Sequence, residues 1–461
     1  MSKEKLTDTR MSPSKVTGSG SGSEPSKSSS PVDAHENMVV QSMTFPTDSY
    51  DDSSDTMTQY LEEEPAPLGT DDAGSLFANF STIGNQRLKE IRTKIISPEK
   101  RKKARTWSLR EASKLIGRSD ALIRRDFSDQ LNKKPNGNYF LTLNDINMLR
   151  DYYDTRYVRP EGSEPMILGV LNFKGGVAKT TSSVHLAQKA AIDGLRVLLV
   201  DVDPQASSSF SLGPFIPDLE LDQDDVLTNA MMNNPEYIRK IVRTSYFPGI
   251  DIIPANLFLQ DLELALPNND INNVRTMGPV ILRLKRALDL VKHHYDLIIV
   301  DNGPNMGSIT LNALTCCNGL VIPVPPSAYD HASFVMLCTS LSGAFYEEKK
   351  KLEYLRILIT KHSGNKSAIE NEAQLRELYG DYVMGSVMAA SAEVERSSSS
   401  MSSVYDRQPG SKSKSTYTRA IEHMDAVNNE IIDDLKALWS QQAEAAMGHQ
   451  KEMSDEQVEQ A

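Results

Sequence analysis

Residues 168–182 read LGVLNFKGGVAKTTS, an apolar run followed by a glycine pair, a lysine and two threonines. Gly175 and Gly176 carry no side chain, so their N–H groups can turn toward phosphate oxygens. A helix that begins just after them presents the positive end of its dipole to the same anion. In such a loop Lys179 reaches the β- and γ-phosphates of a nucleoside triphosphate, and Thr180 ligates magnesium. The segment therefore predicts an α/β domain that binds a nucleotide with Mg²⁺.

The loop departs from the common pattern G-x-x-x-x-G-K-[ST], because Phe173 and Ala178 stand where its glycines belong. It reads K-G-G-x-x-K-[ST] instead, with Lys174 before the glycine pair, and this resembles the deviant Walker A motif of the ParA/MinD family of ATPases. The resemblance implies that the nucleotide is ATP, that two chains form an ATP-sandwich homodimer, and that Lys174 acts catalytically on the partner's nucleotide. The implied ATP-binding residues are Lys174, Gly175, Gly176, Val177, Ala178, Lys179, Thr180 and Thr181.

Two later apolar runs end in carboxylates. Residues 196–203 read RVLLVDVD, and residues 295–304 read YDLIIVDNGP. Buried parallel strands of doubly wound folds place their ligands at their carboxyl ends, so we predict that Asp301 and Asp201 serve the magnesium site. Asp203 resembles the family's second aspartate, which orients the attacking water, and is predicted to be catalytic. One such aspartate alone would indicate only a helix N-cap; three phosphate-handling elements in order favour the nucleotide site.

Further apolar runs at residues 319–326, 355–361 and 382–388 are separated by helix-length segments. This alternation predicts a mainly parallel, doubly wound sheet of the phosphate-loop ATPase class. We expect the ATPase domain to span residues 165–440 and a polar C-terminal tail to span residues 441–461.

The charge of the chain is unevenly distributed. Residues 1–82 carry 5 Lys or Arg against 14 Asp or Glu and are rich in serine, so we predict a disordered tail there. Residues 86–126 carry 14 Lys or Arg against 5 Asp or Glu, in a chain of net charge −12. Such a local excess of positive charge indicates contact with phosphates.

Within the basic stretch, residues 106–127 read TWSLREASKLIGRSDALIRRDF, which predicts two helices joined by a turn near Gly117. Residues 140–153 add a hairpin arm and another helix, so we predict a winged helix-turn-helix domain at residues 105–160. Residues 83–104 predict a charged helix that could dimerise. Any basic run can also be a solvated helix face. The candidate DNA contacts are Arg118, Ser119, Arg124 and Arg125, with Lys412, Lys414 and Arg419 late in the ATPase domain.

The order of these parts resembles the larger plasmid-partition ParA proteins, the SopA-like group, over residues 83–440. The resemblance implies a cytoplasmic ATPase that coats nucleoid DNA without sequence preference when it is an ATP-bound dimer. It implies as well that a ParB-like centromere-binding protein stimulates hydrolysis, and that the ADP form represses its own operon by binding operator DNA.

Two alternatives remain open. The chain could be primarily a nucleotide-regulated transcriptional repressor, or a MinD-like positioning ATPase that lies on a membrane. The C-terminal helix argues against a membrane, because Glu422, Asp425 and Asp433 would be repelled by an anionic bilayer. The three cysteines lack metal-ligand spacing, which argues against iron–sulfur relatives.

Overall fold

The computed structural model describes residues 72–96, 102, 104–133, 135, 137–268, 271–406 and 414–459. The chain divides into two units, Met1–Leu76 and Phe77–Ala461. The tail predicted at residues 1–82 lies outside the described residues up to residue 71.

Helix α1 (Ala73–Ile96) begins ten residues earlier than the helix predicted at residues 83–104. Residues 73–82 are therefore helical, and their assignment to the disordered tail was wrong. Asp72 caps the helix, because its carboxylate accepts a hydrogen bond from the Ser75 N–H at 3.0 Å. The segment also contains no proline, so nothing interrupts the helix before Ile96.

The ATPase domain is built on a seven-stranded sheet with the order β5-β6-β4-β7-β3-β8-β9. All neighbouring strands are parallel except β5, which runs antiparallel to β6. This is the mainly parallel sheet that the alternating pattern predicted. The strands are β3 (Met166–Val170), β4 (Val197–Asp201), β5 (Arg243–Thr244), β6 (Ile250–Ile253), β7 (Leu297–Asp301), β8 (Gly319–Val324) and β9 (Tyr354–Ile359).

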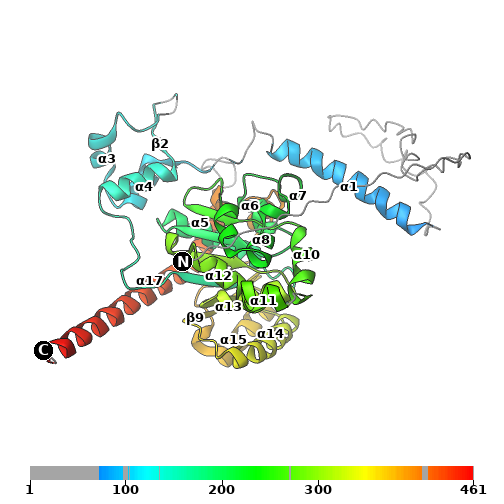
Figure 1. Cartoon of the computed structure of the whole chain (residues 1–461). Coiled ribbons are helices and arrows are strands. Elements are labelled where there is room, and N and C mark those ends of the chain that lie inside the picture. Colours follow the sequence, from blue (N-terminus) through cyan, green and yellow to red (C-terminus); the bar gives the residue numbers. More distant parts are fainter. Residues whose placement is uncertain are drawn as a thin grey trace, which may run out of the picture. The chain divides into compact units, whose positions relative to one another are not determined.

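Helices cover both faces of the sheet (Figure 1). Along β4, Val197 and Leu199 pack with α5 and α17 on one face, while Leu198 and Val200 pack with α8, α10 and α12 on the other. Strands buried on both faces must be apolar at every position, which explains their unbroken apolar runs. The helices are α5 (Lys179–Ile192), α6 (Ser207–Leu212), α7 (Pro217–Glu220), α8 (Thr228–Met232), α9 (Ile238–Ile241), α10 (Phe258–Ala265), α11 (Ile271–Met277), α12 (Arg283–Asp289), α13 (Ser308–Cys316), α14 (Ala328–Glu348), α15 (Lys366–Tyr379), α16 (Ala392–Ser399) and α17 (Lys414–Glu459).

The strand predicted at residues 382–388 does not form. Val383 and Ala389 make only isolated bridges, to Ile357 and His362. Between them, the N–H groups of Gly385 and Ser386 donate to the carboxylate of Glu430 in α17, at 2.7 Å each. A side chain from a distant helix thus takes the hydrogen bonds that a neighbouring strand would otherwise supply.

Helix α17 continues without a break to Glu459 (Figure 1), so the predicted polar tail at residues 441–461 is helical up to that residue. Its apolar stripe, which includes Met424, Ile431 and Leu435, is buried in the core of the ATPase domain, as expected from core packing. That face is therefore not available for insertion into a bilayer. In the described part of the chain, no helix is both long and apolar enough to cross a membrane.

The small domain holds β1 (Trp107–Ser108), α2 (Leu109–Ile116), α3 (Asp120–Phe127), β2 (Phe140–Leu141) and α4 (Leu143–Tyr152). The strands β1 and β2 pair antiparallel. Ser108 and Glu111 form a capping box at the start of α2, and the Ser119 hydroxyl caps α3. Gly117 ends α2 with φ +72°, a conformation that costs glycine little. Local capping and one glycine thus produce two short helices joined by a tight turn near Gly117, as the sequence predicted.

The small domain is fastened to the ATPase domain through the carboxyl end of α5. Arg150 of α4 is only 4% exposed, and its guanidinium donates to the carbonyl of Ile192 at 2.8 Å and to that of Leu115 in α2 at 3.0 Å. Arg156 donates to the carbonyl of Gly194 at 3.0 Å. Two cations therefore sit at the negative end of the α5 dipole, where positive charge is favourable.

Arg150→Met is expected to lower the free energy of unfolding by roughly 2 to 4 kcal/mol, because it leaves buried carbonyls at two helix ends without their donor. Urea denaturation measures the effect, with Arg110→Met on the exposed face of α2 as the matched control. Equal stability of the two variants would contradict a structural role for this arginine.

Candidate nucleotide site

The phosphate loop connects β3 to α5 and leaves open space above its glycines. A Cβ atom added at Gly175 or Gly176 would meet no protein atom within 4 Å. Gly176 has φ +72°, and Ala178, immediately before α5, has φ +73°. An alanine in this left-handed conformation costs of order 1 to 2 kcal/mol, which explains why the common pattern has glycine there. The loop thus keeps the phosphate-cradling shape despite the departure in its sequence.

A cavity of about 430 Å³ lies over this loop, a volume within the range of small-molecule sites. Six of the predicted ATP-binding residues line it, and so does Asp203. The lining residues are Gly175, Gly176, Ala178, Lys179, Thr180, Thr181, Asp203, Gln205, Ser207, Pro304 and Lys361. The structure therefore brings the predicted loop and one predicted aspartate together.

The two lysines of the motif point to different partners. The Lys179 ammonium donates to the carbonyl of Lys174 at 3.0 Å, and the Lys179 side chain is buried. Burial lowers the pKa of Lys179, while the charges of Asp301 and Asp203 oppose that shift. The ammonium of Lys174 pairs with Asp330 at the start of α14, at 2.7 Å. In the single chain Lys174 is therefore held by its own α14.

Asp301 ends β7 directly behind the loop and is fully buried. Its carboxylate accepts hydrogen bonds from the hydroxyls of Ser183 at 2.9 Å and Ser208 at 2.8 Å, and from Thr180. Burial raises the pKa of Asp301 to about 6. The contact with Thr180 places this carboxylate one hydrogen bond away from the hydroxyl that is expected to ligate the ion.

Asp201 lies beside Asp301, because β4 and β7 pair these two residues in register. Its carboxylate accepts from the N–H of Ser209 at 2.9 Å, the hydroxyl of Ser209 at 2.7 Å and the N–H of Asp203 at 3.2 Å. Burial, followed by the charge of Asp301, raises the pKa of Asp201 to about 7. Asp201 does not line the cavity, so in this geometry its contacts shape the loop that carries Asp203.

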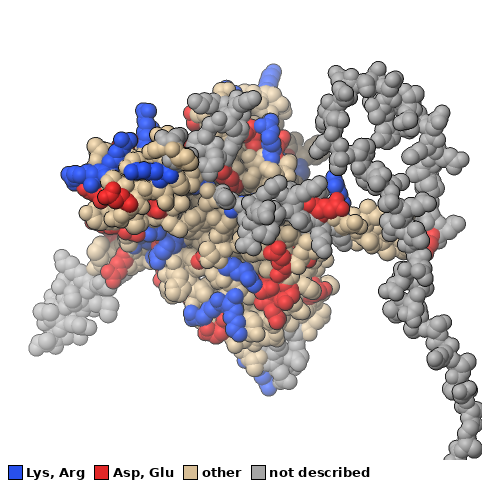
Figure 2. Space-filling view, turned by 90° about the horizontal axis from the view of Figure 1, so that it is seen from above, with Lys and Arg blue, Asp and Glu red and all other residues tan. Residues whose placement is uncertain are grey.

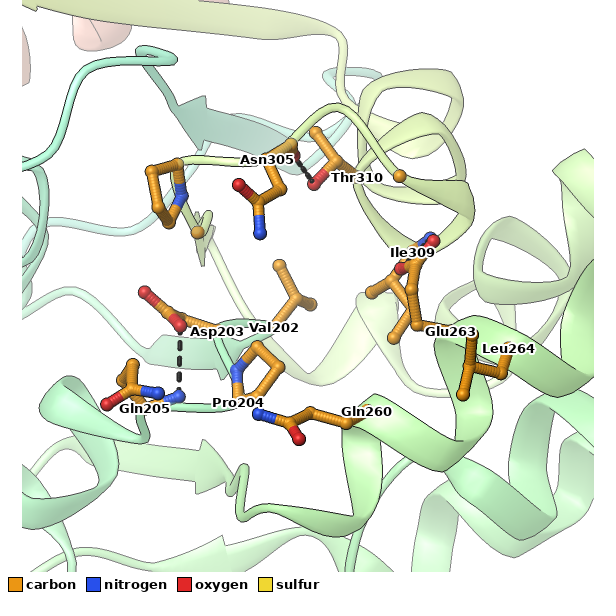
Figure 3. A pocket seen from close by; sticks show the side chains of 13 residues that line it. Val202, Asp203, Pro204, Gln205, Gln260, Glu263, Leu264, Asn305, Ile309 and Thr310 are labelled. Carbon is orange, nitrogen blue, oxygen red and sulfur yellow. Dashed lines mark hydrogen bonds between the residues drawn. The ribbon is translucent and has the colours of Figure 1, made fainter. Parts of the chain in front are cut away.

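Asp203 lies at the border of two cavities. It lines the one over the phosphate loop and a second one of about 440 Å³ that also contains Gln260 and Glu263 (Figure 3). A Cβ atom at Gly303 would lie 3.4 Å from the Asp203 carboxyl carbon, so the loop after β7 packs closely on this aspartate.

Several residues of the site were not in the predicted set. Lys361 lines the cavity from the end of β9, with φ +51°, and the hydroxyl of Thr360 beside it donates to the carbonyl of Val177 at 3.0 Å. Ser207 joins the lining from the start of α6. The only sequence signal for them was their position after an apolar strand.

The candidate DNA contacts of the small domain are exposed. Arg124 and Arg125 lie on α3, where Arg125 pairs with Asp126 at 2.8 Å. Arg118 is exposed as well, but its guanidinium donates back to the carbonyl of Tyr153 at 3.1 Å and lies over the Tyr153 ring. Figure 2 shows Lys and Arg side chains gathered over the small domain.

The late basic candidates are less fully described. Arg419 is exposed on α17, Lys414 is the first residue of that helix, and Lys412 lies outside the described residues.

Comparison with known proteins identifies the family. Residues 166–354 match the model of an AAA domain family. SopA of Escherichia coli K12 is 33% identical over 361 residues, which cover 74% of this chain and 92% of SopA. The sporulation initiation inhibitor Soj of Bacillus subtilis is 40% identical over 163 residues, covering 35% of this chain and 59% of Soj.

A solved structure of a partition protein has the same fold, with a TM-score of 0.55, 19% identity, and coverage of 79% of this chain and 98% of that one. The likeness to SopA extends over nearly all of that relative, and the phosphate loop has the geometry its sequence predicted. The chain belongs to the SopA-like ParA family of partition ATPases, which hydrolyse ATP with Mg²⁺ as cofactor.

Proposed function

We propose that this partition ATPase binds DNA without sequence preference as an ATP-bound homodimer, and that a ParB-like partner stimulates its hydrolysis. With ADP, it represses its own operon through the small domain. The observation that carries the proposal is the combination, in one unit, of a phosphate loop containing Lys174 with a basic two-helix segment, α2–turn–α3, that exposes Arg124 and Arg125. Its place of action would be the cytoplasm, on the nucleoid.

The residues present fit ATP and Mg²⁺. The open space over the glycines admits phosphate oxygens, and Thr180 with Asp301 supplies the oxygen donors that Mg²⁺ prefers. Bound Mg²⁺ neutralises charge on the phosphates. In the proposal Lys179 binds the β- and γ-phosphates, Asp301 orients the Thr180 hydroxyl, and Asp203 orients the attacking water. Hydrolysis then depends mainly on positioning and charge, which fits slow intrinsic turnover.

The proposed dimer requires Lys174 to change its partner. Its ammonium pairs with Asp330 in the single chain and would have to leave that carboxylate to reach the nucleotide of a second chain. The side chain is 40% exposed, so solvent screening keeps the pair weak enough for such an exchange.

The first experiment measures binding of the purified protein to random DNA and to its own upstream region, without nucleotide and with ADP, ATP or a non-hydrolysable ATP analogue. Binding to random DNA only with ATP, together with preference for the upstream region with ADP, supports the proposal. Binding that ignores the nucleotide on both DNAs would refute it.

The exposed arginines of α3 give a separable prediction. Arg124→Ala with Arg125→Ala is expected to weaken operator binding by about tenfold or more, since each lost base or phosphate contact removes roughly 1 kcal/mol or more. Binding to random DNA with ATP should change little. Arg239→Ala in α9, at an exposed arginine, is a control for loss of an arginine elsewhere, and an equal loss on both DNAs would contradict two separate surfaces.

The presence of the small domain favours a second candidate function, in which the protein is primarily a transcriptional repressor. Such a protein would show a large ratio of operator to random-DNA affinity with every nucleotide. The MinD-like alternative has less support, because the apolar stripe of α17 is buried.

A further inference from the structure

Helix α13 begins immediately after the loop that follows Asp301, and its first turn is capped from another helix. The residue at its N-cap, Gly307, has no side chain to offer. Instead Glu263 of α10 accepts hydrogen bonds from the N–H of Ser308 and, at 3.0 Å, from the N–H of Ile309. A carboxylate in this place satisfies two N–H groups and is favoured by the helix dipole.

Gly307 makes room for this contact. Its φ is −99°, so its backbone does not require glycine, yet a Cβ atom there would overlap the Glu263 carboxyl group. The absence of a side chain at Gly307 therefore leaves the space that the Glu263 carboxyl group occupies, although the two residues are 44 positions apart in the sequence.

The contact fixes one end of the loop at residues 303–307. At the other end, the Asn302 amide donates to the carbonyls of Val170 at 3.3 Å and Val300 at 3.1 Å. In between, the Thr310 hydroxyl donates to the carbonyl of Asn305 at 2.7 Å, as seen in Figure 3.

The loop held in this way faces the reaction site. Gly303 packs on Asp203, and Pro304 lines the cavity over the phosphate loop. Glu263 itself lines the second cavity, which Asp203 also borders, and does not reach the first.

We propose that Glu263 is a positioning residue for ATP hydrolysis. It holds the start of α13 and thereby fixes the loop at residues 303–307 against Asp203, without contact to the nucleotide. The inference rests on the proposed role of Asp203. Because small displacements of reacting groups have large effects on rate, loss of this contact lowers kcat while ATP affinity stays the same.

The test compares Glu263→Ala and Glu263→Gln with Asp261→Ala, an exposed acid on the same helix. Glu263→Ala is expected to lower kcat by about tenfold with ATP Kd within twofold of wild type. Glu263→Gln retains one acceptor oxygen, so an intermediate kcat is expected. This conservative variant also keeps the test valid if Glu263→Ala does not fold. Turnover of Glu263→Ala equal to that of Asp261→Ala, or a loss confined to ATP affinity, would overturn the inference.

Gly307→Ala tests the same contact from the other side. Alone, its methyl group displaces Glu263 and lowers kcat to a similar extent; added to Glu263→Ala, it meets no carboxyl group and changes kcat no further. If the double variant lowered kcat by the product of the two single-variant factors, the inference would be overturned. Asp203→Ala is measured in parallel: normal turnover there would remove Asp203 from the mechanism, whereas the Glu263 and Gly307 variants report on the loop independently.

Discussion

Lys179→Ala is expected to abolish ATP binding at micromolar concentrations, with Kd raised by at least about a hundredfold. The ammonium is buried beneath the phosphate loop, and charge-assisted hydrogen bonds to phosphate contribute roughly 3 kcal/mol, which corresponds to that factor. All ATP-dependent DNA binding should disappear with it, because the proposed dimer forms around the nucleotide.

Isothermal titration with a non-hydrolysable ATP analogue measures this change. Lys366→Ala, which removes a lysine that is 90% exposed on α15, is the matched control. An unchanged Kd in Lys179→Ala would mean that the cavity over the phosphate loop holds its ligand in another way.

Asp203→Ala is expected to lower the rate of ATP hydrolysis by a factor of about a hundred or more, while ATP binding persists. The carboxylate lines the cavity beside Lys179 but is not needed to hold the phosphates, and loss of a group that positions or activates water typically costs this much. Single-turnover release of phosphate gives the rate, and Asp381→Ala, at an exposed acid far along the chain, is the control. Undiminished turnover would exclude Asp203 from the mechanism.

The nucleotide site was predictable where its information is local. The phosphate loop, β4, β7 and the two helices α2 and α3 each occupy a short stretch whose glycines, caps and apolar runs specify the structure, and the order of the motifs identified the family. Ala178 has a left-handed backbone conformation that is unusual for alanine. The loop keeps its shape all the same, because the neighbouring residues of the motif determine it.

The rest depends on contacts between distant segments. Lys361 lines the cavity over the phosphate loop from the segment just after β9, and Glu263 of α10 caps α13 from outside that cavity; neither residue belongs to a motif. The apolar run at residues 382–388 has the composition of a strand, but it makes only isolated bridges, and two of its N–H groups donate to the carboxylate of Glu430 in α17. The limits of α1 and α17 were misplaced for a related reason, since a polar composition does not by itself exclude a helix.

If the small domain binds operator DNA, as proposed, the arginine caps at the carboxyl end of α5 have a consequence for how DNA and nucleotide influence each other's binding. The 14 residues of α5 span about 21 Å, with the nucleotide loop at one end and Arg150 and Arg156 at the other. If α5 takes different positions with ATP and with ADP, the small domain, which is bonded to the carboxyl end of α5, is displaced with it. Linkage then requires that operator DNA change the affinity for nucleotide by the same factor as the nucleotide changes the affinity for DNA. The operator would thus act as an effector of nucleotide binding, and its occupancy would be visible in the equilibrium affinity for ATP and ADP.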